Sequence, residues 1–545
     1  MEDIRSAAKK FSIKNAFDYG KAELNAVVNK VIASVSDPKS RMKEIVGICR
    51  EEVAAVNLYS HDQLINAYSV YSEEFEGKAK ETAERTSKPK MILDGAEENI
   101  FVTRFPPEPS GYMHIGHAKA LMLEYEFALK YNGKLYLYFD DTNPEKEKQE
   151  YVDKIRENSL WLGAKFDKEY YASDNILAMY EYAKKLMAGG NAYVCTCPIE
   201  KVRENRGNST ACEHRLSSVN DNLSLWEDML NKKIVENGAV LRMKGDLSSS
   251  NTAMRDPTLF RIKYAPHYRQ GSKYVVWPTY DFNTPIMDSI NGITDAIRSK
   301  EYELRDEVYY TLLKMLNLRQ PRLHSISRLN IKNNLTSKRE INSFLEKGLI
   351  WGYDDPRLVT IDGLRRRGII PEAIKEFVLA FGMSKTDGVA EIEKLLSINR
   401  GLLDARAARF YAVENPIKLY VANMKGTDVK LRIYLDNSNK LREYSLGDFL
   451  YISERDIAYF AAGNKVRLKD LFDVNILSKN GVLKADMASV SVAHMPIVQW
   501  VPGETAVNCN LIFVGELIDE NGEFNKEGII EKSAVAEYAI SQLNI

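Results

Sequence analysis

Arg104-Phe-Pro-Pro-Glu-Pro-Ser-Gly-Tyr-Met-His-Ile-Gly-His117 is the stretch that decides the fold of this chain. An apolar run at residues 100–102 precedes it and predicts a strand, after which three closely spaced prolines exclude any regular element. Apolar residues then recur at helical spacing from Ile115 to Leu129. The stretch therefore predicts a strand, a tight loop and a helix.

Two histidines lie in the first turn of the predicted helix. His114 and His117 are three residues apart and so share one face, and Gly116 leaves room for a flat group against the backbone. A helix N-terminus adds unpaired N–H groups and a positive dipole end, which suit phosphate. The arrangement predicts a nucleoside triphosphate as ligand. The alternative is that both histidines are surface residues of an amphipathic helix.

A second strand and helix follow directly. Leu135–Phe139 is an apolar run that ends in Asp140-Asp-Thr-Asn-Pro144, and residues 145–162 have the pattern of an amphipathic helix. Strand, helix, strand, helix is half of a doubly wound parallel sheet, whose ligands bind at the carboxyl ends of the strands. Because Arg104 and Asp140 both fall at such ends, we expect them to face one pocket.

Three of the five cysteines cluster in the next segment. Cys195-Thr-Cys197 is followed, after 14 residues, by Cys212-Glu-His214. Three thiols and an imidazole in two close pairs predict one structural Zn²⁺ site with protein ligands only. The alternative is a chance cluster of reduced thiols.

The opening stretch resembles the ATP-binding signature of class I aminoacyl-tRNA synthetases, in the form found in the glutamyl/glutaminyl group. Leu335-Thr-Ser-Lys-Arg339, just after Arg328-Leu329, resembles the second signature of this class, the flexible lysine loop. Its Ser-Lys-Arg form is that of the same subgroup rather than the commoner Lys-Met-Ser-Lys-Ser. The resemblance covers roughly residues 95–545 and implies a multidomain α/β protein with a Rossmann-type catalytic domain.

The resemblance implies a role for each matching residue. His114, His117 and Lys338 would form the catalytic set at the phosphates of ATP, which brings Mg²⁺ with it. The ATP site would also include Gly116, Arg328, Leu329, Ser337 and Arg339. The amino-acid site would consist of Arg104, Tyr280 and Arg298 at the substrate side chain, Asp140 at its α-amino group, and Glu108 and Thr284 nearby. Thr284 departs from the Asn, Cys or His of the family at that place.

Arg298 bears on the choice of amino acid. In glutaminyl enzymes its place is held by a small uncharged residue, and in glutamyl enzymes by Arg. The resemblance therefore implies the ATP-dependent ligation of L-glutamate to tRNA-Glu through a glutamyl-adenylate, with tRNA-Gln as an open second acceptor. The physics agrees, since a buried glutamate side chain needs a cation to meet it.

Apolar residues at helical spacing predict a helical N-terminal appendage (1–90). The resemblance implies the domains that follow: the first half of the catalytic domain (91–190), an acceptor-stem-binding insertion with the zinc site (191–270), the second half with the lysine loop (271–340), a helical stem-contact region (341–410) and an anticodon-binding region of β-barrels (411–545). The short alternating runs after residue 411 indicate the β-rich ending of the archaeal/eukaryotic type. In the stem-contact region Arg357, Arg365, Arg366 and Arg367 are predicted to bind tRNA.

Composition bounds the remaining possibilities. Hydrophobic residues make up 45% of the 545 residues and charged residues 28%, which is ordinary for a water-soluble globular protein. No apolar run reaches membrane-spanning length and the first residues do not resemble a signal peptide, so we expect a cytoplasmic monomer without a membrane partner. Three other functions remain open: a glutaminyl-tRNA synthetase, a noncatalytic RNA-binding paralogue and a tRNA-independent nucleotidyltransferase.

Overall fold

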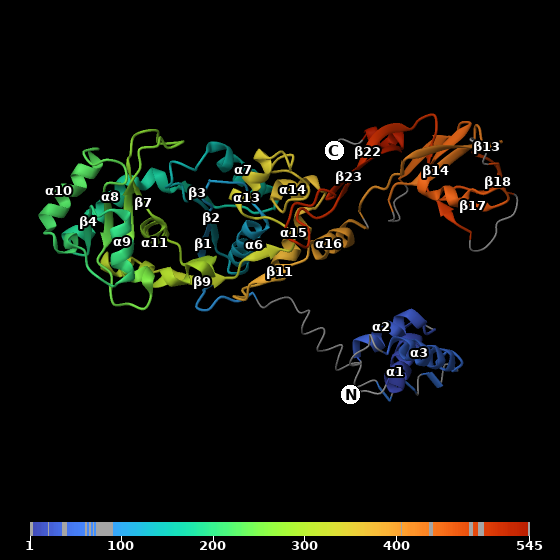
Figure 1. The fold of residues 1–545 in the computed structure, drawn as a ribbon, viewed down its shortest axis with the longest axis horizontal. Coiled ribbons are helices and arrows are strands. Elements are labelled where there is room, and N and C mark those ends of the chain that lie inside the picture. The colour runs from blue at the N-terminus through green and yellow to red at the C-terminus, as the bar shows by residue number, and fades with distance from the viewer. Residues whose placement is uncertain are drawn as a thin grey trace. The chain divides into compact units, whose positions relative to one another are not determined.

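The computed structural model describes residues 4–19, 21–34, 41–59, 63–64, 67–68, 70–71, 91–404, 406–434, 440–478, 483–488 and 495–542. The chain forms two compact units, Met1–Lys88 and Pro89–Ile545 (Figure 1). The predicted boundary at residue 90 lies among residues 72–90, outside the described part. No helix of the described part combines the length and the apolar character needed to cross a membrane.

The first unit is helical, as its sequence predicts. Among its described residues the longer helices are α1 (Ile4–Tyr19), α2 (Leu24–Ser34) and α3 (Met42–Val56). They pack through one apolar cluster that includes Ala7, Val27 and Cys49, each fully buried or nearly so. The helical periodicity of the sequence thus reflects a core internal to this unit.

A parallel sheet forms the centre of the second unit. Strands β1 (Val102–Phe105), β2 (Lys134–Phe139) and β3 (Lys168–Tyr171) pair in parallel, as do β8 (Asp295–Ser299) and β9 (Arg322–Ile326). β8 lies beside β1, where Thr294 N donates to Val102 O at 2.8 Å. The spatial order β3-β2-β1-β8-β9 is that of a doubly wound fold, with its switch point between β1 and β8. This confirms the predicted catalytic architecture.

Helices connect the strands of this sheet. They are α6 (Ile115–Lys130), α7 (Gln149–Trp161), α8 (Ile176–Ala188), α11 (Tyr280–Ile290) and α12 (Asp306–Met315). α6 buries an apolar face that includes Leu121, Met122 and Phe127. Gly133, in the turn before β2, is required by space, since a Cβ there would lie 2.3 Å from Phe101 O. α7 begins four residues later than predicted, because a turn at residues 144–146 and two irregular residues precede it.

An antiparallel sheet interrupts the parallel one. It consists of β4 (Ala192–Cys195), β5 (Val240–Met243), β6 (Thr258–Ile262) and β7 (Val276–Pro278), with α9 (Ile199–Gly207) and α10 (Val219–Leu230) between β4 and β5. The sequence predicted that the chain returns to the nucleotide fold at residue 271. In the structure β7, just after this boundary, pairs with β6 as the last strand of the antiparallel sheet.

The segment after the parallel sheet is mostly helical. It contains α13 (Lys338–Glu346), α14 (Ile361–Arg366), α15 (Pro371–Leu379) and α16 (Ile392–Asp404). The region 341–410 was predicted to be helical, but Gly382 has a φ of +51° and the short strand β11 (Gly388–Ala390) pairs in parallel with β10 (Leu329–Ile331). α15 packs against α6, so this segment covers the catalytic sheet (Figure 1).

The last part of the chain consists of strands, as predicted. A seven-stranded mixed sheet has the order β20-β17-β18-β19-β13-β16-β21, and smaller sheets join β12 with β23 and β22, and β14 with β15. The bounds are β12 Ala412–Glu414, β13 Pro416–Ala422, β14 Asp428–Arg432, β15 Leu441–Ser445, β16 Phe449–Ser453, β17 Lys465–Leu468, β18 Asp473–Ser478, β19 Leu483–Met487, β20 Ile497–Val498, β21 Trp500–Pro502, β22 Val507–Val514 and β23 Ile529–Ala536.

Candidate active site

A cavity of about 820 Å³ lies at the carboxyl ends of β1, β2 and β8. Its position is the one expected of a ligand site in a doubly wound sheet. Twelve of the fourteen residues predicted for the ATP and amino-acid sites line it: Arg104, Glu108, His114, Gly116, His117, Asp140, Tyr280, Thr284, Arg298, Arg328, Leu329 and Ser337. Lys338 and Arg339 do not line this cavity.

The two histidines cap the N-terminus of α6. His114 Nδ1 accepts from Gly116 N at 3.1 Å, and His117 Nδ1 accepts from His114 N at 3.2 Å. A neutral imidazole that accepts at Nδ1 carries its proton at Nε2. Burial lowers the pKa of His117 to about 4 and the pKa of His114 well below its ordinary value. Both rings are therefore neutral Nε2–H donors near pH 7.

Gly116 is needed for a reason that the sequence did not reveal. A Cβ at this position would lie 2.8 Å from His114 Cε1 and 3.8 Å from Leu329 O. The missing side chain therefore makes room for the imidazole of His114 itself. The predicted flat ligand against the backbone would have to lie beyond that ring.

Arg104 is fixed by a buried carboxylate. Its Nε donates to Asp288 Oδ1 at 2.7 Å and its NH2 to Asp288 Oδ2 at 3.2 Å, while NH1 donates to Ile297 O at 3.0 Å. Burial opposes the charge of Arg104, but Asp288 and Glu124 keep its pKa above the ordinary value. Asp288 occupies the bidentate face, so a substrate carboxylate would reach only the NH1 edge of Arg104.

Arg298 has more exchangeable partners. It is 7% exposed and donates from NH1 to Tyr280 OH at 3.2 Å, while NH2 pairs with Asp306. The Asp306 side chain is 35% exposed, and Arg298 Nε has no hydrogen-bond partner within the described residues. Arg298 is therefore a cation in the cavity wall, and one of its two partners, Asp306, is accessible to solvent.

Asp140 lies at the end of β2, where the sequence places it. Its Oδ1 accepts from Asn283 Nδ2 at 2.6 Å and from Thr142 Oγ1 at 3.2 Å. Burial and the neighbouring carboxyls of Glu108 and Asp141 raise the pKa of Asp140 to about 7. A cation bound here would offset that repulsion and favour the carboxylate.

A buried lysine that the sequence did not reveal supports the strand-end segment at Arg328. Lys119 Nζ donates to Ser327 O at 2.8 Å and to Ser327 Oγ at 3.0 Å, and the residue is 1% exposed. Burial lowers the pKa of Lys119 to about 8. Arg328 itself is exposed and pairs with Glu301 at 2.6 Å. A charged residue within the apolar run of α6 was the available sign of this contact.

Lys338 is the first residue of α13, and its side chain contacts the loop between β1 and α6 instead of lining the cavity. Its Nζ donates to Ser110 O and lies 4.8 Å from the centre of the Tyr151 ring. Ser337, just before it, lines the cavity, whereas Arg339 is exposed. The lysine would have to leave Ser110 to reach a phosphate.

The four predicted zinc ligands come together. Their ligand atoms all lie within 4.8 Å of one another, with Cys195 Sγ 3.8 Å from Cys212 Sγ. Thiolates bound at about 2.3 Å to a tetrahedral ion lie about 3.8 Å apart, so the spacing fits Zn²⁺. His214 Nε2 contacts Thr196 Oγ1 at 2.9 Å, which leaves Nδ1, 3.4 Å from Cys197 Sγ, as the ligand atom.

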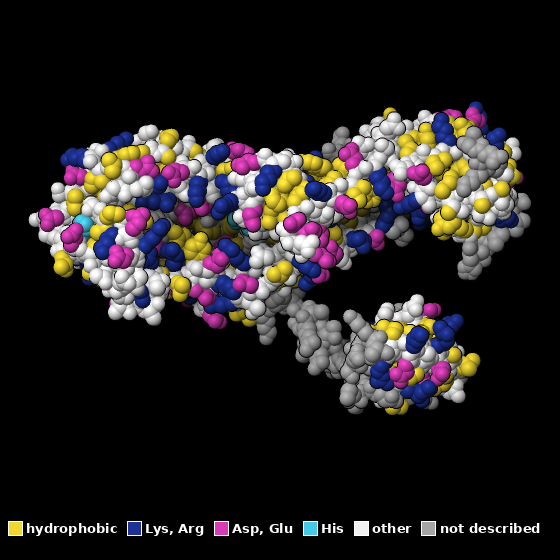
Figure 2. Space-filling model, viewed as in Figure 1, with side chains coloured by type: hydrophobic (Ala, Val, Ile, Leu, Met, Phe, Trp, Pro, Cys, Tyr) yellow, Lys and Arg dark blue, Asp and Glu magenta, His cyan; other side chains and the backbone are white. Residues whose placement is uncertain are grey.

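The arginines predicted to bind tRNA differ in exposure. Arg365 and Arg366 are exposed and pair with Glu157 and Asp354, and Arg367 is half-buried with NH2 on Val514 O. Arg357 differs from them, because it is 4% exposed. Its Nε and NH2 donate to both oxygens of Asp355 and to Leu349 O, so little of its guanidinium is open to a phosphate. On the viewed face, Lys and Arg are interspersed with Asp and Glu (Figure 2).

Comparison with known proteins identifies the family. The model of the tRNA synthetases class I (E and Q), catalytic domain, matches residues 101–404, and that of their anticodon-binding domain matches residues 407–491. The chain belongs to the class I tRNA synthetases of the E and Q group. This synthetase is 36% identical to the glutamate–tRNA ligase of Nitrosopumilus maritimus over 99% of the chain and 95% of the relative.

Other archaeal relatives agree. The synthetase is 37% identical to the glutamate–tRNA ligase of Korarchaeum cryptofilum, over 95% of the chain and 92% of the relative. It is 36% identical to the glutamate–tRNA ligase of Pyrococcus furiosus, over 98% of the chain and 96% of the relative. The chain is thus an aminoacyl-tRNA ligase with a catalytic domain that contains parallel sheets and an anticodon-binding domain of mainly antiparallel strands. This confirms the resemblance that the two ATP signatures indicated.

Proposed function

We propose that this synthetase joins L-glutamate to tRNA-Glu through a glutamyl-adenylate and releases AMP and diphosphate. The observation that carries the proposal is Arg298, a nearly buried cation in the wall of the cavity. The names of the archaeal relatives agree with it. A glutamate side chain enters a closed pocket as an anion, and its desolvation is prohibitive unless a cation meets it.

In this proposal Arg298 and Tyr280 hold the side-chain carboxylate. The guanidinium offers a planar fork that matches a carboxylate, and Asp306 can turn to solvent when the substrate replaces it. Arg104, held rigid by Asp288, adds its NH1 edge. Glutamine would place amide N–H groups against these donors and leave Arg298 without its counterion.

The other end of the amino acid would face acidic groups. Asp140 meets the α-ammonium. The positive charge of this group offsets the burial and the neighbouring carboxyls that raise the pKa of Asp140, and so favours the carboxylate. Glu108 and Thr284 line the same cavity and contribute nearby contacts. The α-carboxylate is then free to attack the α-phosphate of ATP.

ATP would lie over the start of α6. The Nε2–H groups of His114 and His117 donate to phosphate oxygens without adding charge, and Lys338 joins them after leaving Ser110. Gly116, Arg328, Leu329, Ser337 and Arg339 complete this part of the site. Charge develops mainly on phosphate oxygens in the transition state, so positioned donors are needed more than a nucleophilic side chain. Mg²⁺ would enter with ATP.

The remaining assignments concern tRNA. We propose that the insertion binds the acceptor stem and carries one structural Zn²⁺, and that the strands after residue 411 form anticodon-binding barrels. Arg365, Arg366 and Arg367 would contact the stem, and the protein would act as a cytoplasmic monomer. Whether tRNA-Gln is also charged is read out in the same assay when that tRNA is supplied.

The test is a charging assay with purified tRNA pools, ATP, and radiolabelled glutamate or glutamine. We expect glutamate to appear in acid-precipitable tRNA. More efficient charging of glutamine would establish a glutaminyl enzyme instead, and charging of neither amino acid would favour a noncatalytic RNA-binding protein.

A further inference from the structure

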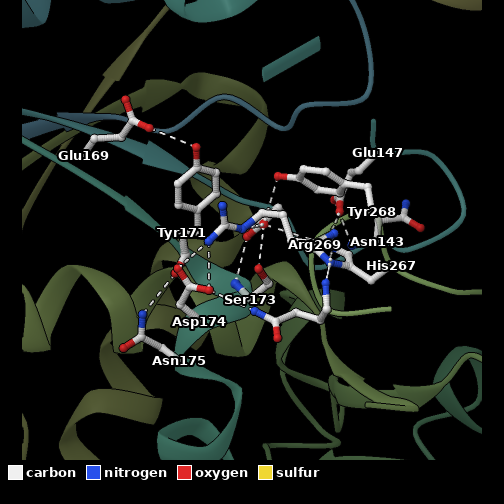
Figure 3. Close-up of polar contacts among 12 residues, drawn as sticks. Asn143, Glu147, Glu169, Tyr171, Ser173, Asp174, Asn175, His267, Tyr268 and Arg269 are labelled. Carbon is white, nitrogen blue, oxygen red and sulfur yellow. Dashed lines mark hydrogen bonds and ion pairs between the residues drawn. The ribbon is translucent and has the colours of Figure 1, made fainter. Parts of the chain in front are cut away.

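A second polar network lies beside the cavity, where the loop of residues 140–148 meets the turn between β6 and β7 (Figure 3). Asp141, Glu147 and His267 form its centre and are 0%, 5% and 2% exposed. Glu147 also lines the cavity, so the network shares a wall with the proposed amino-acid site. The proposed mechanism gives none of these three residues a role.

The turn fixes the proton of His267. Its Nδ1 accepts from Arg269 N at 3.2 Å and from Gln270 N at 3.1 Å, and its backbone pairs with Gly271 in both directions. Burial lowers the pKa of His267, so the ring is neutral and carries its proton at Nε2. That nitrogen lies 3.3 Å from Glu147 Oε2 and 3.7 Å from Asp141 Oδ2.

The turn that carries His267 is held in place by contacts of the next two residues, Tyr268 and Arg269. Arg269 NH2 donates to both oxygens of Asp174, at 3.0 and 2.7 Å, and its guanidinium carbon lies 3.7 Å from the centre of the Tyr171 ring. Tyr268 OH donates to Asp141 Oδ2 at 3.1 Å. Figure 3 shows these side chains converging from the two sides of the network. The imidazole therefore cannot retreat from Glu147 without breaking several contacts.

Glu147 faces that imidazole. Its Oε1 accepts from Asn143 N at 2.8 Å, whereas within the described residues neither its Oε2 nor His267 Nε2 has a hydrogen-bond partner, and these two buried atoms lie 3.3 Å apart. Burial raises the pKa of Glu147 to about 9, which measures how poorly this carboxyl is solvated. Glu108, Asp140 and Glu147 thus present three carboxyl groups to one cavity, where each can compete for the ammonium of the substrate.

We propose that His267 is a positioning residue for amino-acid binding: its Nε2–H holds the Glu147 carboxyl in the cavity wall, which leaves Asp140 as the carboxylate that meets the α-ammonium of the substrate. Without the imidazole, Glu147 turns toward the ammonium and shifts the amino acid away from the α-phosphate. The inference rests on the proposed function, since the ammonium is that of the amino-acid substrate.

Two substitutions separate the two nitrogens of the ring. His267→Asn keeps an acceptor for the N–H groups of Arg269 and Gln270 but lacks the donor that faces Glu147. His267→Gln keeps a donor that faces Glu147 but lacks the acceptor for the N–H groups of Arg269 and Gln270. The readouts are the KM values for amino acid and for ATP in tRNA charging, which do not depend on the fraction of folded enzyme, together with Tm.

We expect His267→Asn to raise the KM for glutamate about 10-fold, the upper end of the effect of losing one neutral hydrogen bond, and to leave the KM for ATP and Tm near wild type. His267→Gln should lower Tm and keep the KM for glutamate near wild type. An unchanged KM for glutamate in His267→Asn would overturn the proposal, as would equal rises of both KM values. If the wild type prefers glutamine, the proposed substrate fails, and the same comparison with glutamine still tests His267, because both amino acids carry the ammonium.

Discussion

Two neutral imidazoles at the start of α6 line the end of the cavity that we propose for the phosphates of ATP. A charged imidazole there would attract phosphate more strongly, but it would have to be buried at the positive end of a helix. The structure instead uses the Nδ1 atoms of His114 and His117 to cap backbone N–H groups and leaves two Nε2–H donors. Such donors act on developing charge without holding the ground-state triphosphate too tightly.

The protonation state of His117 gives a first prediction. Its pKa of about 4 implies that the ring stays neutral, with the proton on Nε2, from pH 8 down to pH 5. On acidification the unfolded chain binds this proton first, so the residue's contribution to the free energy of unfolding falls between pH 6.5 and about 4. NMR of ¹⁵N-histidine-labelled protein, with His117→Asn for assignment, should show no His117 titration above pH 5. A midpoint near 6.5 would contradict the geometry.

Lys338 gives a second prediction. Lys338→Ala should slow adenylate formation at least ~100-fold, the typical cost of removing one preorganised donor to transition-state charge. The KM for glutamate should hardly change, because Lys338 lies outside the cavity wall. The measurement is ATP–pyrophosphate exchange in the presence of tRNA. Lys347→Ala, which removes an exposed lysine just after the same helix, is the matched control. Equal activity of the two variants would mean that residues 335–339 are misassigned.

At the residue scale, the sequence predicted which side chains line the cavity better than it predicted their hydrogen-bond and ion-pair partners. Arg104 and Arg298 were placed in the cavity correctly, but their counterions, Asp288 and Asp306, were not foreseen. Asp288 lies within an otherwise apolar part of α11, and only the fold brings it beneath β1. Arg357 shows the converse, since a cluster of arginines indicates a basic surface but does not reveal that one of them is buried against Asp355.

At the scale of elements, the cysteine cluster gives a third prediction, which a measurement of bound zinc tests. We expect about one Zn²⁺ per chain by elemental analysis, and its removal by chelation should lower Tm, because structural zinc contributes directly to folding. Cys212→Ser should lose the metal. Cys509→Ser is the control, since Cys509 lies in β22 outside the cluster, and it should keep the zinc. Protein purified without chelators that contains no zinc would overturn the assignment.

The elements themselves were largely predictable from periodicity. The helix at Ile115, the strand at Leu135 and the runs that form β13, β14, β17 and β22 all lie where alternation or helical spacing placed them. The pairing of the strands was harder to predict from the sequence. β7 is as apolar as a parallel strand, and its pairing with β6 depends on the turn at His267–Gly271 rather than on its own residues.

At the scale of the whole molecule, the insertion and the catalytic sheet share the network around Asp141 and His267. Tyr268 and Arg269 link the β6–β7 turn to the loop that carries Asp140 and to the segment after β3. A macromolecule that contacts the insertion could therefore influence the amino-acid site through packed, buried side chains.

This continuity leads us to predict that bound tRNA is needed to activate the amino acid. We expect ATP–pyrophosphate exchange with glutamate to be weak alone and to appear when tRNA-Glu is added. A tRNA with its terminal ribose oxidised serves as a control, because it binds but cannot be charged. Equal exchange rates with and without tRNA would reject the prediction.

The central claim is that a buried arginine selects glutamate, and the ratio of kcat/KM for glutamate to that for glutamine tests it most directly. A polar site of this kind rejects the wrong substrate by roughly 10⁴–10⁵. We expect wild-type protein to show a ratio of this order. Arg298→Cys should lower kcat/KM for glutamate at least ~10³-fold and narrow or invert the ratio, whereas Arg319→Cys, at an exposed arginine outside the cavity, should leave it unchanged. A wild-type enzyme that charges glutamine more efficiently, or a ratio that Arg298→Cys does not alter, would contradict the account.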